Sequence, residues 1–250
     1  MTEPVSPPDD QAIGAAARLN RVGSALVIEN SPAWNLGRLE EWLDSAGVRP
    51  EVVRPHRGEA IPSRVTDHDC LIALGGGRGV EWAGELAGLL AHAVADSTPT
   101  LAICSSARLL AVEFGGVVSP VEEFRPGPRL LGRRDAAGDD PLFATAPMTI
   151  DVVSWRHEEL TALPSNAVSL ATSPQGAPDV FRVGDRAWGV QSHMELDGAM
   201  VTELGGDDDL AARVEKIGEY LADTWRPIIT RFAGVATGRT AGQPLPLLDS

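Results

Sequence analysis

The sequence predicts an α/β protein with a central, mostly parallel sheet and a small antiparallel extension. Short runs of strand-forming residues alternate with helical patterns in the first half of the chain. These runs are apolar at consecutive positions, which is typical of parallel strands that helices cover on both faces. Further along, shorter strand patterns follow one another across Pro, Gly and Asn turns, and this indicates antiparallel pairing.

The predicted elements begin at residue 24. Strands are expected at 24–30, 51–55, 69–77 and 99–104, and helices at 36–47, 84–96 and 105–116. In the first helix, Leu39 and Leu43 recur at helical spacing, and Gly47 ends the pattern. Shorter strands at 148–153, 167–172, 179–184 and 186–191 make up the expected extension.

A long helix is expected to begin near 205–210, because apolar residues recur in steps of three and four from Leu210 to Phe232. Pro227 is expected to bend or break it, since proline removes a hydrogen bond from a helix interior. The apolar face predicts docking on the flank of the domain, with a homodimer contact as the alternative.

The chain divides into three predicted parts. Residues 1–23 form a partly disordered N-terminal segment that includes a possible short helix at 11–21, residues 24–235 form one domain, and residues 236–250 form a flexible tail.

Composition excludes several classes of protein. With 43% hydrophobic and 22% charged residues, the chain is neither disordered nor collagen-like. Its formal charge of −14 repels a phosphate backbone, so we expect no nucleic-acid partner. Two cysteines are too few for a disulfide framework or a structural zinc site. The sequence has no apolar run of membrane-spanning length and no secretory signal pattern, so the expectation is a cytoplasmic protein with no metal or cofactor.

Cys104 lies where a predicted strand meets a predicted helix, among the small residues Ala102, Ser105 and Ser106. A reactive side chain on such a turn is the arrangement of a nucleophile elbow. The N-terminus of the following helix stabilises an anionic sulfur and thereby lowers the thiol pKa. The alternative is a buried core cysteine, which is the commonest state of a free cysteine.

The segment that follows the last predicted strand holds a histidine and a glutamate two positions apart. In an extended chain, His193 and Glu195 point the same way, so the carboxylate can hold the imidazole as in a catalytic triad. The alternative is an ordinary surface pair. His157, followed by Glu158 and Glu159, is the nearest rival, and no metal-ligand spacing is present.

A glycine run closes the strand predicted at 69–77. Alone it indicates only a tight turn. Beside a nucleophile, free backbone N–H groups of the run Gly75-Gly76-Gly77, together with that of Ser105, can bind a developing oxyanion.

In this order, LGGG, PTLAICSSARLLAVEFGG and DRAWGVQSHMELD resemble the class I glutamine amidotransferases, especially the stand-alone domain related to the GMP synthase amidotransferase. The resemblance covers about residues 24–200. It implies a flavodoxin-like αβα sandwich in which Cys104 attacks the side-chain amide of glutamine. It further implies that His193 is the general base and acid, that Glu195 orients it, and that Gly76 with Gly77 supplies oxyanion donors.

The sequence departs from the family pattern around the substrate. The family elbow reads Gly-x-Cys-x-Gly-x-Gln, and Ala102, Ser106 and Arg108 stand at the places of the two glycines and the glutamine. A guanidinium cannot accept a hydrogen bond and prefers carboxylates or phosphates. Arg108, Ser106 and Gln191 are the predicted substrate-binding residues of this altered pocket.

Two further positions depart from the same pattern. Arg156-His157-Glu158 replaces the family's His-x-Asp, and Met194 replaces the proline after the histidine.

The resemblance predicts a cysteine-dependent hydrolase that releases ammonia or an amine from glutamine or a γ-glutamyl-like amide through a thioester. A separate synthetase subunit is a possible partner. The alternatives are a non-catalytic binding or regulatory module of the same fold and a PfpI-like protein. Most PfpI-like proteins place a histidine directly after the nucleophile, where this chain has Ser105.

Overall fold

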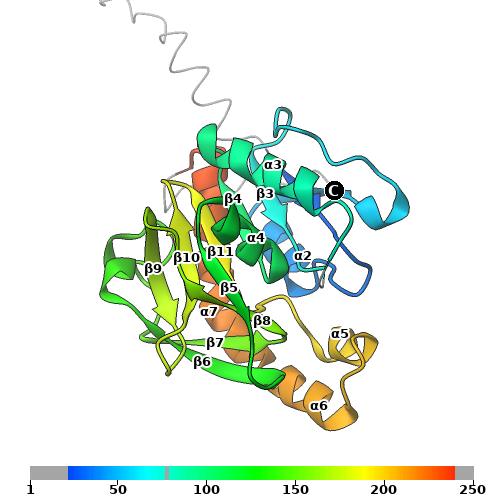
Figure 1. Cartoon of the computed structure of the whole chain (residues 1–250), viewed down its shortest axis with the longest axis vertical. Helices are drawn as coiled ribbons and strands as arrows, with labels where there is room; N and C mark the ends of the chain where they lie inside the picture. Colours follow the sequence, from blue (N-terminus) through cyan, green and yellow to red (C-terminus); the bar gives the residue numbers. More distant parts are fainter. Residues whose placement is uncertain (1–21, 77–78, 240–250) are drawn as a thin grey trace, which may run out of the picture.

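A nine-stranded sheet forms the centre of the protein, and helices cover both of its faces (Figure 1). The structure is a computed structural model that describes residues 22–76 and 79–239. The strands of this sheet are β1 (Gly23–Ile28), β2 (Val48–Val53), β3 (Cys70–Ala73), β4 (Thr100–Ile103), β6 (Gly127–Arg133), β7 (Thr149–Ser154), β9 (Ala167–Thr172), β10 (Pro178–Val183) and β11 (Ala187–Val190). Two more strands, β5 (Val117–Pro120) and β8 (Glu158–Ala162), pair with each other in a separate antiparallel sheet.

The helices connect and cover these strands. They are α2 (Arg38–Ser45), α3 (Ala83–Ala95), α4 (Ser105–Glu113), α5 (Gly198–Glu203), α6 (Asp208–Lys216) and α7 (Gly218–Thr237), with short 3-10 turns at Pro55–Arg57 and Asp135–Asp139. Within the described residues, no helix is long and apolar enough to cross a membrane. No cluster of three or more His, Cys, Asp or Glu side chains suited to a metal ion is found there either.

Strand order divides the large sheet into a parallel and an antiparallel part. The order is β2-β1-β3-β4-β11-β10-β9-β6-β7. Pairs from β2 to β11 are parallel, and pairs from β11 to β7 are antiparallel. The predicted class, a mostly parallel sheet with an antiparallel extension, is therefore confirmed.

Two hydrophobic cores lie on opposite faces of the sheet. Along β1, Ala25 and Val27 point to one core, and Leu26 and Ile28 point to the other. The first core is closed by α2 and α7, and the second by α3 and α4 (Figure 1). This double burial explains why the parallel strands are apolar at every position.

The long C-terminal helix was predicted correctly in extent but wrongly in where it breaks. Pro227 lies inside a continuous α7, and the chain bends instead at Ile217, between α6 and α7. The physical reason is packing: α6 lies on α5 and β6, whereas α7 lies on α2 and β7, so the helix must change direction before its second part. At the bend, a Cβ on Gly218 would lie 2.8 Å from the Arg38 guanidinium.

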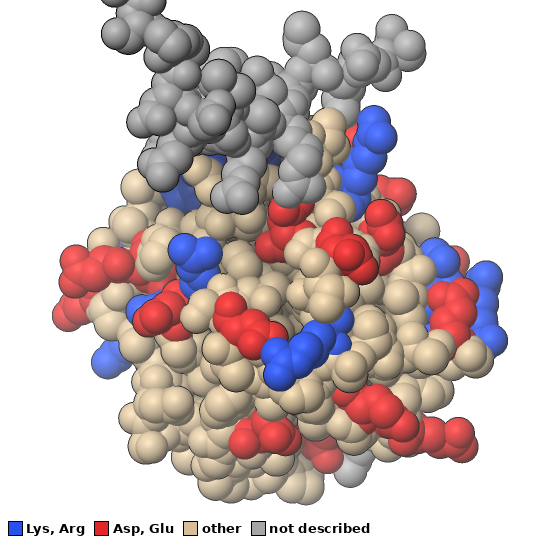
Figure 2. Space-filling model, turned by 90° about the horizontal axis from the view of Figure 1, so that it is seen from above, with Lys and Arg blue, Asp and Glu red and all other residues tan. Residues whose placement is uncertain are grey.

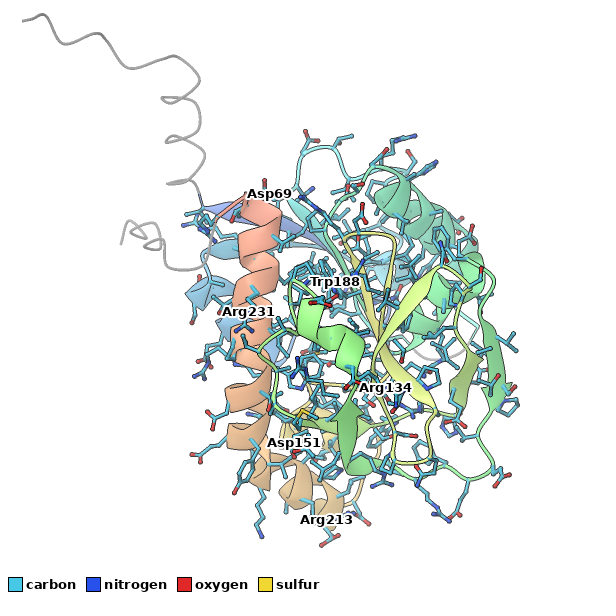
Figure 3. All side chains as sticks on the ribbon, turned by 90° about the vertical axis from the view of Figure 1, so that its left-hand side faces the viewer. Asp69, Arg134, Asp151, Trp188, Arg213 and Arg231 are labelled. Carbon is cyan, nitrogen blue, oxygen red and sulfur yellow. The ribbon has the colours of Figure 1, made fainter. Side chains whose placement is uncertain are left out.

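Helix α7 docks along the flank of the domain, as its apolar face predicts. Figure 3 shows it lengthwise, with Arg231 on it and Asp69 beside its C-terminal end. Trp225 is buried and its indole N–H donates to the Asp151 carbonyl at 2.8 Å.

Several elements differ from the prediction. Strands β5, β6 and β8 and helix α5 were not predicted, because their residues are half exposed and lack a clear period. The helix expected at 11–21 lies outside the described residues, as do residues 240–250 of the expected tail.

Acidic and basic side chains are mixed over the face drawn in Figure 2. On this face, Asp and Glu side chains form separate groups with basic side chains between them.

Candidate active site

Cys104 occupies the sharp turn between β4 and α4. Its backbone has φ 56° and ψ −116°, a conformation that costs a non-glycine residue about 1–3 kcal/mol. Its N–H donates to the Val190 carbonyl of β11 at 2.8 Å, which ties the turn to the neighbouring parallel strand. The side chain stands at the N-terminus of α4 and is 3% exposed. The turn therefore has the elbow geometry that the sequence predicts.

His193 and Glu195 form a buried pair just after β11. His193 Nδ1 lies 2.6 Å from Glu195 Oε1, and the other carboxylate oxygen accepts the Met194 N–H at 3.0 Å. The backbone of His193 pairs with Val153 in both directions at 2.8 Å, and Trp34 stacks on the imidazole with ring centroids 4.4 Å apart. The Nδ1–H group therefore donates to the Glu195 carboxylate, which leaves Nε2 facing the other side of the ring.

The imidazole and the thiol meet above Gly75. A Cβ on Gly75 would lie 3.3 Å from Cys104 Cβ and 3.5 Å from His193 Cε1, so these two side chains are close neighbours. His193 Nε2, the ring atom next to Cε1, is buried and has no hydrogen-bond partner of ordinary geometry within the described residues. Glycine at position 75 leaves room for the thiol and the imidazole to approach.

Electrostatics favours a thiolate facing an imidazolium. Burial raises the pKa of Cys104, but His193 and Arg108 lower it by more, so the net shift is downward. Burial lowers the pKa of His193, and Cys104 and Glu195 together raise it to about 10. Each group thus stabilises the charged form of the other.

The glycine loop after β3 packs tightly against the end of β1. A Cβ on Gly76 would lie 2.2 Å from Asn30 Cβ, so no larger residue fits. The Asn30 amide donates to the Leu74 carbonyl at 2.7 Å and to Ser106 Oγ at 3.3 Å, which holds this loop against α4.

Predicted oxyanion donors lie at this junction. Within the described residues, the backbone N–H groups of Gly76 and Ser105 donate to no protein acceptor. Gly77, the third predicted donor, lies outside the described residues.

A pocket of about 300 Å³ lies between α3 and α4 beside the elbow. The predicted substrate residues Arg108 and Ser106 both line it. Ser106 also donates to the Leu74 carbonyl at 2.7 Å, so its hydroxyl is committed to the loop. The remaining lining is partly polar and largely apolar, from Asn30, Gly79, Val80, Ala83, Leu86, Ser105, Leu109, Val112, Val118 and Glu158.

Gln191, the third predicted substrate residue, has an amide that is bonded at both ends. Its side-chain oxygen accepts the Leu160 N–H at 2.9 Å, and its nitrogen donates to the Pro178 carbonyl at 2.5 Å. Gln191 therefore joins β8 to β10, and its role in binding substrate stays a prediction without a contact to support it.

The rival histidine lies in different surroundings. His157 stacks on Phe124 with ring centroids 4.1 Å apart and faces a second pocket, of about 420 Å³, together with Arg213. Its neighbour Arg156 points inward and binds Asp179 at 2.6 Å and Ser192 at 3.1 Å. The segment before His193 is thus anchored by a buried ion pair.

Sequence reasoning missed Asn30, Trp34 and Trp155. Asn30 and Trp34 follow β1, and a polar residue at the carboxyl end of a buried parallel strand is a signal that could have singled out Asn30. The Trp155 carbonyl lies 3.9 Å from the Cys104 sulfur, and no sequence pattern indicates this contact.

Comparisons with known proteins agree with this architecture. No protein-family model matches the chain. It is 35% identical over 98 residues to GMP synthase (glutamine-hydrolyzing) of Thermomicrobium roseum, a match that covers 39% of this chain and only 18% of that relative. It is 25% identical over 170 residues to the glutamine amidotransferase-like protein YfeJ of Salmonella typhimurium, covering 64% of this chain and 70% of the relative.

The fold has close counterparts among solved structures. A glutamine amidotransferase from Thermotoga maritima superposes with a TM-score of 0.73 at 19% identity, over 85% of this chain and 99% of that one. In sequence the chain is thus similar to glutamine amidotransferases, and its fold is that of a solved glutamine amidotransferase.

Proposed function

We propose that the protein hydrolyses an amide of glutamine or of a γ-glutamyl-like compound, with Cys104 as nucleophile. The observation that carries the proposal is the buried His193–Glu195 pair, whose imidazole interacts with the thiol of a cysteine on a strained elbow. A dead site has no physical need for all three groups in this arrangement.

The proposed reaction begins with attack of the Cys104 thiolate on the amide carbonyl carbon. The carbonyl oxygen becomes an oxyanion, which the N–H groups of Gly76 and Ser105 bind. His193 gives its Nε2 proton to the leaving nitrogen, the C–N bond breaks, and ammonia or an amine departs. The acyl group remains on the sulfur as a thioester.

Water completes the cycle. Neutral His193 takes a proton from water, the hydroxide attacks the thioester carbonyl, and the C–S bond breaks. The products are a carboxylic acid and the thiolate, and His193 is again an imidazolium held by Glu195.

The pocket between α3 and α4 supports a substrate that carries a carboxylate. Arg108 lines this pocket, and its guanidinium matches carboxylate geometry. A glutamyl group offers such a carboxylate. The rest of the lining is largely apolar, which suits a carbon substituent on the amide nitrogen of a γ-glutamyl compound.

The released ammonia or amine is proposed to leave the enzyme or to pass to a separate synthetase chain. The relative named glutamine-hydrolyzing GMP synthase is much longer than the stretch it shares with this protein.

The decisive experiment measures release of ammonia or amine from glutamine and from γ-glutamyl amides. We expect Cys104→Ala to lose all measurable turnover, because the thioester cannot form without the sulfur. Cys70→Ala is the matched control and should keep wild-type turnover, since Cys70 is a fully buried core residue. Equal turnover of wild type and Cys104→Ala would refute the proposal. Labelling of Cys104 by a glutamine-like chloroketone would identify glutamine as a ligand.

A further inference from the structure

The Arg108 guanidinium lies against the Cys104 sulfur inside the protein. Arg108 is one helical turn beyond Cys104, and its two terminal nitrogens are 3.9 and 4.0 Å from Sγ. The residue is only 6% exposed. Within the described residues, no carboxylate reaches ion-pair distance of this guanidinium, and the sulfur is the acceptor it contacts.

A buried guanidinium needs a negative partner. Arginine stays protonated in proteins, so Arg108 cannot lose its charge to suit a buried position. Burying a charge without a partner is strongly unfavourable. A thiolate on Cys104 provides this negative charge, and its sulfur lies at nearly the same distance from both terminal nitrogens.

We propose that Arg108 is a second cationic partner of the Cys104 sulfur, so that the thiolate does not depend on His193 alone. The inference rests on the proposed function only in taking Cys104 as the nucleophile. It gives a specific role to a residue that stands where the family pattern has an uncharged glutamine.

Other charged groups also act on this sulfur. His193 supports the thiolate and Glu195 opposes it, both from the segment after β11. Arg156, from the segment after β7, interacts favourably with Cys104 as well. Arg108 differs from Arg156 because it has no carboxylate of its own within the described residues, whereas Arg156 binds Asp179.

The second cation matters most when the thioester breaks. In that step the C–S bond cleaves and the electron pair goes to sulfur as a thiolate. Because Arg108 keeps its charge throughout the cycle, it stabilises the leaving thiolate whatever the protonation state of His193.

Alkylation of Cys104 by iodoacetamide as a function of pH tests the proposal. The chain has only two cysteines, and Cys70 is inert because burial and Asp69 raise its pKa. In a Cys70→Ala background, we expect Arg108→Gln to shift the alkylation midpoint upward by about 1–3 pH units. Arg108→Lys, which restores a positive charge, should recover part of this shift. Arg64→Gln, which removes an exposed arginine paired with Asp96, should leave the midpoint unchanged.

A second pair of variants keeps the test decisive if Arg108→Gln does not fold. His193→Gln alone should raise the midpoint, because burial of the sulfur then outweighs the support from Arg108. This variant provides a background in which the effect of Arg108 is measured without the imidazole. Adding Arg108→Lys to His193→Gln should raise that midpoint further, because one ammonium on a shorter side chain replaces two guanidinium nitrogens that lie 3.9 and 4.0 Å from the sulfur. Far-UV circular dichroism and tryptophan fluorescence check the fold of every variant.

The outcomes separate this inference from the proposed function. A wild-type midpoint in folded Arg108→Gln, or a midpoint that does not change when Arg108→Lys is added to His193→Gln, would overturn the role of Arg108. If the alkylation midpoint depends on Arg108 but the wild-type protein hydrolyses no amide, the proposed function is overturned and the role of Arg108 stands.

Discussion

At the scale of single residues, the site consists of groups whose charges depend on one another. Glu195 holds the Nδ1 side of His193 at 2.6 Å, and the imidazole in turn faces Cys104. All three side chains are almost completely buried, so water screens these charges little. A change at one residue is therefore expected to alter the protonation of the others.

Glu195→Gln tests this coupling. The amide still accepts one hydrogen bond but carries no charge, so the pKa of His193 should fall. We expect kcat on the amide substrate to drop by about 100-fold or more with a smaller change in KM, because the imidazolium that protonates the leaving group becomes rarer. Steady-state kinetics across pH measures this. An unchanged kcat would show that Glu195 does not act on the histidine during turnover.

The same variant has a pH signature in stability. The pKa of His193 is raised to about 10, so the stability it contributes is fully present below about pH 6.5 and is lost as the pH rises through 10. We expect Glu195→Gln to lower the free energy of unfolding by about 1–3 kcal/mol near pH 6 and by less above pH 10. Urea titrations at the two pH values measure the difference, and a larger loss at high pH would contradict it.

At the scale of elements, the antiparallel extension holds the histidine segment in place. Asp179 on β10 accepts the Ser192 N–H at 3.0 Å and binds Arg156 at 2.6 Å. The backbone of His193 pairs with Val153, the residue before the end of β7. The edge of the parallel strands that carries Cys104 is therefore closed by contacts from the extension.

Asp179→Ala should remove this anchor. Asp179 is fully buried and binds the Arg156 guanidinium. Its loss therefore removes the carboxylate closest to that buried positive charge. We expect a loss of about 3–5 kcal/mol in the free energy of unfolding, measured by urea denaturation. Asp209→Ala, which removes an exposed i,i+4 pair with Arg213, is the control and should change it by at most about 0.5 kcal/mol. Equal effects of the two changes would contradict the anchoring role.

At the scale of the whole molecule, one sheet separates two cores that share its strands. Phe232 of α7 packs edge-on against Trp188 in the first core, with ring centroids 6.2 Å apart. Leu110 of α4 is fully buried in the second core. Neighbouring positions of each central strand face different cores. The two cores therefore depend on the same strands, and disruption of one affects the other.

Substitution in either core should therefore weaken the whole domain. We expect Phe232→Ala to cost about 3–5 kcal/mol and Leu110→Ala about 2–5 kcal/mol. In both variants, far-UV circular dichroism and tryptophan fluorescence should report the same unfolding midpoint. Separate midpoints for the two signals would show that the faces unfold independently.

Much of this molecule follows from local sequence pattern. Consecutive apolar runs predict the parallel strands, and small residues around Cys104 predict the turn, because buried strands and tight turns each demand particular residues. The pairing of His193 with Glu195 also follows from spacing, since alternate residues of an extended chain share a face.

Only the tertiary structure decides what these local features meet. Elements distant in sequence produce the bend before Gly218 and the stacking of Trp34 on His193. They also bring the Trp155 carbonyl to the Cys104 sulfur. The two ends of the Gln191 amide likewise bond to β8 and to β10, which the sequence does not indicate. The reason is physical: a side chain's type and period are set along the chain, whereas its partners are set by packing in three dimensions.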